Sequence, residues 1–90
     1  MFTFLKQFFS LFFQMYKREK IEAEYLKKLG KRIKTIRKEK NIKQVNLGYL
    51  CDIEKQSMSR IEAGNTNPSI LLLRKIAEIL GVNVSDFLDF

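Results

Sequence analysis

Residues 44–62, QVNLGYLCDIEKQSMSRIE, decide the fold because their apolar side chains keep a helical period that breaks once and then resumes. The apolar residues of the first segment are Val45, Leu47, Leu50 and Cys51, and those of the second are Ile53, Met58 and Ile61. The break falls at Asp52-Ile53, so the stretch predicts two short helices on different axes, joined by a tight turn. Gly48 has no side chain, which would let another helix cross there at close range.

The second of these helices has hydrogen-bonding side chains left over for its outer face, namely Lys55, Gln56, Ser57, Ser59 and Arg60. Side chains of this kind read base edges and phosphates of DNA. Asp52 stands where the chain must reverse, and Asp tolerates a positive φ better than most residues. The stretch therefore predicts a helix-turn-helix, with a recognition helix at about 55–63.

From about Leu26 to Phe90 the chain resembles the Xre family, whose helix-turn-helix domains are similar to lambdoid phage repressors and Cro proteins. Four segments carry the resemblance, in order LGKRIKTIRKEKNIKQ (29–44), QVNLGYLCDI (44–53), SRIEAGNTNPS (59–69) and LLLRKIAEILGVNVSDFL (71–88). The chain departs from the family pattern at three positions: Gly48 replaces the usual Ala, Asp52 the usual turn Gly, and Glu54 the usual Ser or Thr helix cap. Asp and Glu near a helix N-terminus still favour its dipole, so these departures bear on local geometry more than on family.

The resemblance implies an all-α, five-helix, lambda-repressor-like DNA-binding domain over residues 26–90, preceded by an amphipathic, Phe-rich helical extension over residues 1–25. It also implies a cytoplasmic transcriptional regulator that binds double-stranded DNA as a homodimer, on a near-palindromic operator. Carried over by position, the base contacts are Lys55, Gln56, Ser57, Ser59 and Arg60. We expect phosphate contacts from Lys43 and Gln44, at a helix N-terminus with free amides, and from the polar residues Asn65, Thr66 and Asn67. An ordinary polar loop is the plainer interpretation of the last three.

Arg37 lies one turn beyond Ile33, at the edge of an apolar face where a lone charge would be costly. The resemblance implies its partner, because the matching Arg of the family pairs with the Glu that closes the recognition helix, here Glu62. We expect this ion pair to be structural and not to contact DNA.

The charge of the chain is unevenly placed along its 90 residues, a length that allows one small domain. The net charge is +7, yet residues 17–43 carry twelve Lys or Arg against four Glu, a local charge of +8. The segment after Pro68 is slightly acidic. A basic first half fits a polyanion, either nucleic acid or an anionic membrane surface, although a solvated Lys-rich helix would have the same composition.

The residue types in the chain exclude several kinds of chemistry. With one Cys and no His, neither an intrachain disulfide nor a zinc cluster can form. We find no acid–base or nucleophilic constellation and no Gly-rich phosphate loop, so we expect no catalytic residues, no metal, no cofactor and no enzyme activity. Cys51 ends an amphipathic helix, where a buried core thiol is expected.

Residues 1–16, MFTFLKQFFSLFFQMY, hold six of the eight phenylalanines. A helix here would have a narrow polar stripe and a wide apolar face that needs a cover. Three explanations remain open: the face packs on its own domain or on a second copy, it lies on a membrane interface, or translation begins at Met15 and the upstream residues are a misreading. Residues 17–40 predict either one long helix or two helices hinged at Gly30.

The C-terminal part predicts two further helices. Pro68-Ser69 opens the first, whose buried stripe is expected at Ile70, Leu73, Ile76, Ala77 and Leu80, and Gly81 ends it. Ser85 is a candidate cap for the last short helix. The resemblance implies dimerisation through this C-terminal end.

The alternative function for the whole chain is a protein-interaction module, antitoxin-like or membrane-associated, that uses the Phe-rich N-terminus.

Overall fold

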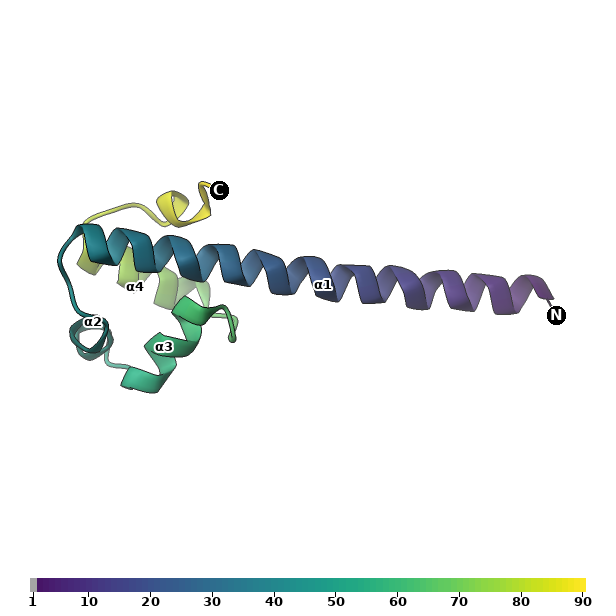
Figure 1. Cartoon of the computed structure of the whole chain (residues 1–90), viewed down its shortest axis with the longest axis horizontal. Helices are drawn as coiled ribbons and strands as arrows, with labels where there is room; N and C mark the ends of the chain where they lie inside the picture. The colour runs from purple at the N-terminus through teal and green to yellow at the C-terminus, as the bar shows by residue number, and fades with distance from the viewer. Residues whose placement is uncertain (1) are drawn as a thin grey trace.

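The computed structural model describes residues 2–90, with side chains from Thr3 onward, so Met1 and the side chain of Phe2 lie outside it. The described residues form four α-helices and one 3-10 helix, with no strand among them (Figure 1). The elements are α1 (Phe2–Glu39), α2 (Gln44–Leu50), α3 (Lys55–Ala63), α4 (Ile70–Leu80) and η1 (Val84–Leu88). The all-α expectation is confirmed. Two details differ, because the N-terminal extension is continuous with the first helix and the last helix is a short 3-10 turn.

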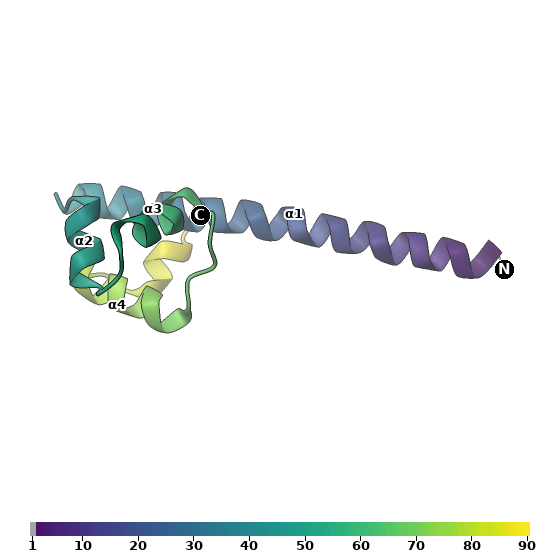
Figure 2. The ribbon, with the colours of Figure 1, turned by 90° about the horizontal axis from the view of Figure 1, so that it is seen from below.

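α1 runs without a break through Gly30, which decides between the one-helix and the hinged alternatives in favour of one helix. The molecule measures 60 × 24 × 19 Å because only the second half of this helix belongs to the folded body. Seen from below, α2, α3 and α4 gather around one end of α1 while the other end projects away from them (Figure 2).

The core lies between the second half of α1 and the four shorter elements. Its buried apolar members are Leu29, Ile33, Ile36, Leu47, Cys51, Met58, Ile61, Leu73, Ile76, Ala77, Leu80 and Phe87. Ile70, expected in the buried stripe of its helix, is 67% exposed instead, and the apolar Leu50 of α2 is 52% exposed. Leu50 lies beside, and not on, the face of α2 that Leu47 and Cys51 share. Ile70 is the first residue of α4 and lines an open groove between α1 and α4.

The helix ends follow ordinary capping rules. The Ser69 hydroxyl accepts a hydrogen bond from the Leu72 amide at 3.1 Å and so opens α4. Gly64 and Gly81 end α3 and α4 in the left-handed conformation, as Gly is free to do. The cap of η1 is Asn83, in a capping box with Asp86, so the candidate role of Ser85 is wrong.

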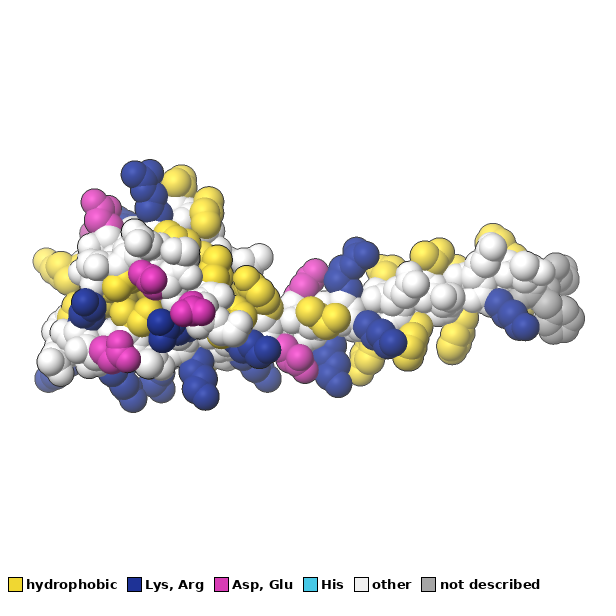
Figure 3. Space-filling model, turned by 90° about the horizontal axis from the view of Figure 1, so that it is seen from above, with side chains coloured by type: hydrophobic (Ala, Val, Ile, Leu, Met, Phe, Trp, Pro, Cys, Tyr) yellow, Lys and Arg dark blue, Asp and Glu magenta, His cyan; other side chains and the backbone are white. Residues whose placement is uncertain are grey.

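The N-terminal half of α1 has its apolar side chains in solvent. The large apolar residues between Phe4 and Tyr16 are 52–74% exposed. Figure 3 shows hydrophobic side chains protruding from the projecting helix and basic side chains near its base. The explanation that this face packs on its own domain is therefore wrong for the described residues. Within residues 2–90, no helix is long and apolar enough to cross a membrane.

Candidate nucleic-acid interface

The turn between α2 and α3 is closed by backbone hydrogen bonds and one left-handed residue. Asp52 has φ 56°, and the Ile53 amide donates to the Gly48 carbonyl oxygen at 3.0 Å. Gly48 is buried there, but a Cβ on it would meet the Ile53 carbonyl oxygen at 3.4 Å and the Met58 Cβ at 3.6 Å. α3 therefore does pack at Gly48 as expected, but these are ordinary contact distances, so the position does not require Gly.

α3 is held by one face and leaves the opposite face open. Met58, Ile61 and Glu62 are buried, and at about 100° per residue the opposite side of the helix carries Gln56, Ser59 and Arg60. All three are exposed. Lys55, also exposed, lies at one flank of this outer face.

Ser57 lies on the other flank of α3 and is half-buried, so it is less open to solvent than Gln56, Ser59 and Arg60. Its position follows from the helical period, because Ser57 is one turn before the buried Ile61. Together with Arg60, Thr66 and Asn67 it lines a hollow of about 270 Å³ between α3, the exit loop and the start of α4. Thr66 is half-buried, whereas Asn65 and Asn67 are exposed.

Arg37 and Glu62 lie in contact inside the domain. The guanidinium donates from Nε to Glu62 Oε2 at 2.6 Å and from Nη2 to Oε1 at 3.0 Å, a bidentate pair. Its Nη1 donates to the Ile42 carbonyl oxygen at 2.8 Å. The pair thereby ties α1, the following turn and the end of α3 together, and both side chains are buried.

Gln44 has a partner that the sequence did not indicate. Its side-chain amide donates to Glu62 Oε1 at 3.0 Å, which completes the hydrogen bonding of that carboxylate from α2. Lys43, the N-cap residue of α2, is exposed, and no side chain caps this helix. The first amides of α2 are therefore free, while the side chain of Gln44 is turned toward the buried pair.

Two glycines bring the end of α3 against α1. A Cβ on Gly30 would come within 2.6 Å of the Glu62 carbonyl oxygen and closer still to that of Ile61, so only Gly fits. A Cβ on Gly64 would meet the Lys27 backbone at 2.6 Å. Gly30 is thus a point of close helix packing and not a hinge, and the orientation of α3 is fixed directly on the long helix.

The surroundings of the turn moderate its charge. Asp52 forms an exposed ion pair with Lys75, whose Nζ lies 3.3 Å from the Asp52 carboxylate.

Cys51 is a free, buried thiol, and burial raises its pKa above the ordinary value. A buried, protonated thiol is poorly nucleophilic, which agrees with the expected packing role.

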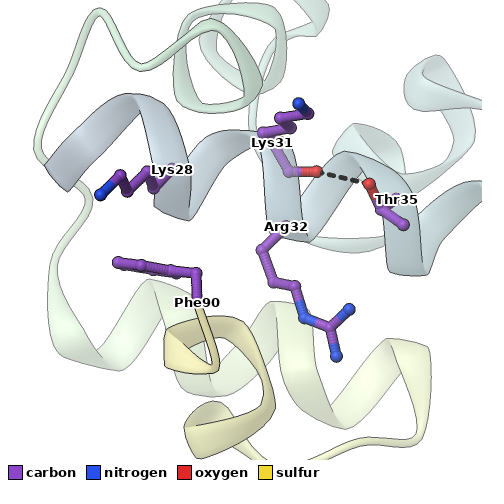
Figure 4. A pocket seen from close by; sticks show the side chains of 5 residues that line it. All are labelled: Lys28, Lys31, Arg32, Thr35 and Phe90. Atoms are coloured by element: carbon purple, nitrogen blue, oxygen red, sulfur yellow. Dashed lines mark hydrogen bonds between the residues drawn. The ribbon is translucent and has the colours of Figure 1, made fainter. Parts of the chain in front are cut away.

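A second hollow lies beside the C-terminal segment (Figure 4). It is lined by Lys28, Lys31, Arg32, Thr35 and Phe90. The Thr35 hydroxyl donates to the Lys31 carbonyl oxygen, and Arg32 Nε donates to the Asp86 carbonyl oxygen at 2.9 Å. The Arg32–Asp86 hydrogen bond holds α1 and η1 together, and η1 lies across α1 from α3 (Figure 1). Within residues 2–90, no three His, Cys, Asp or Glu side chains gather as metal ligands would.

A family model described as helix-turn-helix matches residues 33–87. The chain is 39% identical over 62 residues to the control protein C.BamHI of Bacillus amyloliquefaciens, covering 68% of this chain and 76% of that protein. It is 40% identical over 62 residues to the transcriptional regulator SinR of Bacillus subtilis, covering 68% of this chain and 56% of SinR. The immunity repressor of Bacillus phage phi105 is 39% identical over 57 residues, 63% of this chain and 40% of the repressor.

Solved structures agree with these relatives. The clp gene regulator ClgR of Corynebacterium glutamicum superposes with a TM-score of 0.69 at 25% identity, over 71% of this chain and 68% of that one. The restriction-modification controller protein C.AhdI of Aeromonas hydrophila gives 0.67 at 26% identity, over 69% of this chain and 94% of that one. The matched family model excludes most of α1, so the Phe-rich half of that helix lies outside it. The resemblance to the Xre family is thus confirmed, and the chain belongs to the helix-turn-helix family that includes these transcriptional regulators and repressors.

Proposed function

We propose that this protein regulates transcription by binding a specific DNA sequence with the outer face of α3, as a homodimer in the cytoplasm. The observation that carries the proposal is the division of α3 into a locked inner face and an open polar outer face. Met58, Ile61 and the Arg37–Glu62 pair fix the helix, and Gln56 and Arg60 extend from the other side. A helix presented in this way fits the major groove.

The outer face carries side chains suited to reading bases. Gln56 has the bidentate amide that matches adenine, and Arg60 or Lys55 has the donors that match guanine. Ser59 lies between them and can serve either base. Ser57, on the half-buried flank, is assigned a contact at the edge of the groove, where it adds less to specificity.

Phosphate contacts are assigned to both ends of the motif. At the start of α2, Lys43 and the uncapped amides, including that of Gln44, favour an anion, because the helix dipole is positive there. At the exit of α3, the exposed amides of Asn65 and Asn67 and the half-buried Thr66 would hold the opposite side of the backbone. These contacts would fix register without carrying sequence information.

A homodimer would set two copies of α3 about 34 Å apart, one turn of B-DNA, and would favour a near-palindromic site. The named relatives include repressors and controllers, and a small domain gains affinity and specificity by doubling its contacts. We assign the dimer contact to the C-terminal end of the chain, as the family resemblance implies.

The proposal is tested by selecting bound sequences from random DNA with the full chain, followed by titrations on the selected site. Gln56→Ala should relax the preference at one base pair, a loss of about 1–3 kcal/mol of discrimination. Lys43→Ala should weaken all sequences alike and reduce the salt slope by about 1. Lys6→Ala, which removes the same charge far from α3, is the matched control.

The selected sites should contain two half-sites whose centres are about 10 base pairs apart. Enrichment of no sequence at all, or unchanged binding by both Gln56→Ala and Lys43→Ala, would contradict the assignment of α3 to the groove.

A further inference from the structure

The N-terminal half of α1 presents one continuous apolar surface, made of Phe4, Leu5, Phe8, Phe9, Leu11, Phe12, Phe13, Met15 and Tyr16. All nine are 52–74% exposed. At about 100° per residue they fill an arc of about 200° of the helix, and Thr3, Lys6, Gln7, Ser10 and Gln14 fill the remainder. We call this the aromatic arc. Ordinary surface helices bury a face of this kind, so the arc needs an occupant.

The width of the arc distinguishes between occupants. A second copy in a two-helix coiled coil covers two positions in seven, such as the stripe Phe4, Phe8, Leu11 and Met15. That stripe continues into the charged Arg18 and Glu22, which a parallel pair would set against their own copies. It would also leave Phe9, Phe12 and Tyr16 in water. A lipid surface covers about half of a helix that lies in it, which matches the arc.

The charges on the same segment complement an anionic surface. Residues 2–18 hold no acidic side chain, while Lys6 and Lys17 border one edge of the arc and Arg18 borders the other. Lys17 extends over the Phe13 ring, with Nζ 4.8 Å from its centroid. This is the arrangement in which a long basic side chain lies along buried apolar groups and keeps its charge at the headgroups.

The order of residues along the helix sets the direction of approach. The aromatic arc ends at Tyr16, the basic Lys17 and Arg18 follow it directly, and the first acidic residue is Glu19. The aromatic arc also overlaps the side of α1 that carries Leu26, Leu29 and Ile33 toward the core, so the domain lies on the side of the arc. A flat surface can then meet the helix only at a tilt, with the N-terminal end deepest.

We propose that residues 3–20 of α1 dock obliquely on a lipid bilayer that carries anionic headgroups, with the aromatic arc among the acyl chains. Lys6, Lys17, Arg18 and Lys20 contact the headgroups. The apolar segment rises about 20 Å along the helix, which at a tilt fits within one leaflet. The proposal concerns a part of the chain outside the helix-turn-helix and holds whether or not α3 binds DNA.

The test is sedimentation of the full chain with sucrose-loaded vesicles, of phosphatidylcholine alone and of phosphatidylcholine with 30% phosphatidylglycerol, beside a sample without vesicles. We expect binding to both lipids and at least tenfold tighter binding to the anionic one. Lys6→Gln with Lys17→Gln should weaken anionic binding by about fivefold for each charge removed. Lys38→Gln with Lys40→Gln, the same charge change at the domain end of α1, is the matched control and should cost at most twofold.

A second pair of variants tests the arc itself. Phe8→Gln with Phe12→Gln should reduce binding to both lipids by about tenfold or more, because both rings lie near the middle of the arc. Gln7→Ala with Gln14→Ala, on the polar side, should leave binding unchanged. Circular dichroism confirms that each variant keeps the fold of the domain.

Two results would overturn the proposal. The first is equal pelleting with and without vesicles of either composition. The second is a full chain that forms a dimer in sedimentation equilibrium, loses that dimer in Phe8→Gln with Phe12→Gln, and does not bind vesicles, which would assign the arc to a second copy. Site selection on DNA is a separate readout, so failure here leaves the DNA-binding proposal standing and separately testable.

Discussion

The two halves of α1 share one backbone and have opposite surroundings. In the half that belongs to the domain, Ile33 and Ile36 are no more than 4% exposed, whereas in the projecting half Phe9 is 74% exposed. The projecting half is nevertheless the richer in large apolar side chains. The comparison teaches that hydrophobicity alone does not locate a core, because a core also needs neighbouring elements with a complementary surface.

The two halves also have different reasons to be helical. In the domain, packing against α3 and η1 stabilises α1, and most helical stability in proteins comes from such packing. The projecting half is rich in Phe, a weaker helix former, and it grows from a helix that the domain has already nucleated, which removes the costly first turn. Its helix should therefore depend on the domain, while the domain should not depend on it.

The largest expected difference in unfolding free energy is between two Phe→Ala variants, one in the domain and one in the projecting half of α1. Phe87 is fully buried, so Phe87→Ala should cost about 3–5 kcal/mol, enough to unfold much of a domain of this size. Phe9→Ala should change the unfolding free energy by less than about 0.5 kcal/mol, because the ring is exposed. Urea titration followed by circular dichroism measures both. Similar losses for the two variants would mean that the projecting half is part of the cooperative unit.

The buried ion pair should give an effect nearly as large. Arg37→Met leaves Glu62 buried with only Gln44 as a side-chain donor, at a cost of about 3–5 kcal/mol. Arg18→Met, in the projecting half, should be nearly neutral. Arg37→Met combined with Glu62→Leu should cost less than Arg37→Met alone, because no charge is then left buried. A double variant that loses the sum of both single effects would refute the pairing in solution.

Substitution of Gly30 should have a smaller effect on the unfolding free energy, and the sign of that effect tests the packing of α1 on α3. Alanine normally stabilises a helix relative to glycine, yet Gly30→Ala should cost about 1–3 kcal/mol because its methyl group would overlap the carbonyl oxygens at the end of α3. Ala23→Gly makes the reverse change in the projecting half. It should reduce the helical signal and leave the urea midpoint of the domain unchanged. Stabilisation by Gly30→Ala would show that α1 and α3 lie further apart than described.

The smallest effect concerns Cys51. Burial raises its pKa in the folded state, so on raising the pH the unfolded chain loses the thiol proton first and then binds fewer protons than the folded chain. The contribution of the protonated Cys51 thiol to the unfolding free energy is complete at neutral pH, and it declines as the pH rises above the ordinary thiol pKa. Between pH 7.5 and 10, the unfolding free energy of Cys51→Ala should fall less steeply than that of the unchanged protein. Equal slopes would show that the thiol is hydrated.

Features with local causes could be predicted from the sequence. The bounds of α3, the left-handed Gly64 and the reversal at Asp52 follow from helical period and turn chemistry within a few residues. The partner of Arg37 came from the family resemblance. That Arg37 would need a partner followed from its place on an apolar face.

Features that depend on residues far apart in the chain could not be predicted. Gly30 suggested a hinge because nothing near it in sequence reveals that α3 would end against it. The Gln44 amide seemed free for phosphate because its acceptor, Glu62, is eighteen residues away. The exposure of Ile70 likewise depends on which elements pack near the start of α4, and the helical period does not reveal them. Ser57 is an exception, because its place on the flank, one turn before the apolar Ile61, could have been predicted from the helical period.

The glycine contacts at Gly30 and Gly64 have a mechanical consequence. Because the backbones of α1 and the end of α3 are in direct contact at these glycines, we expect the two helices to move together. The projecting half is then a lever of about 36 Å. A rotation of about 10° at its base sweeps the far end through about 6 Å, a length set by the helical rise. A force applied near Phe4 would therefore act on the orientation of Gln56 and Arg60 through a lever of this length.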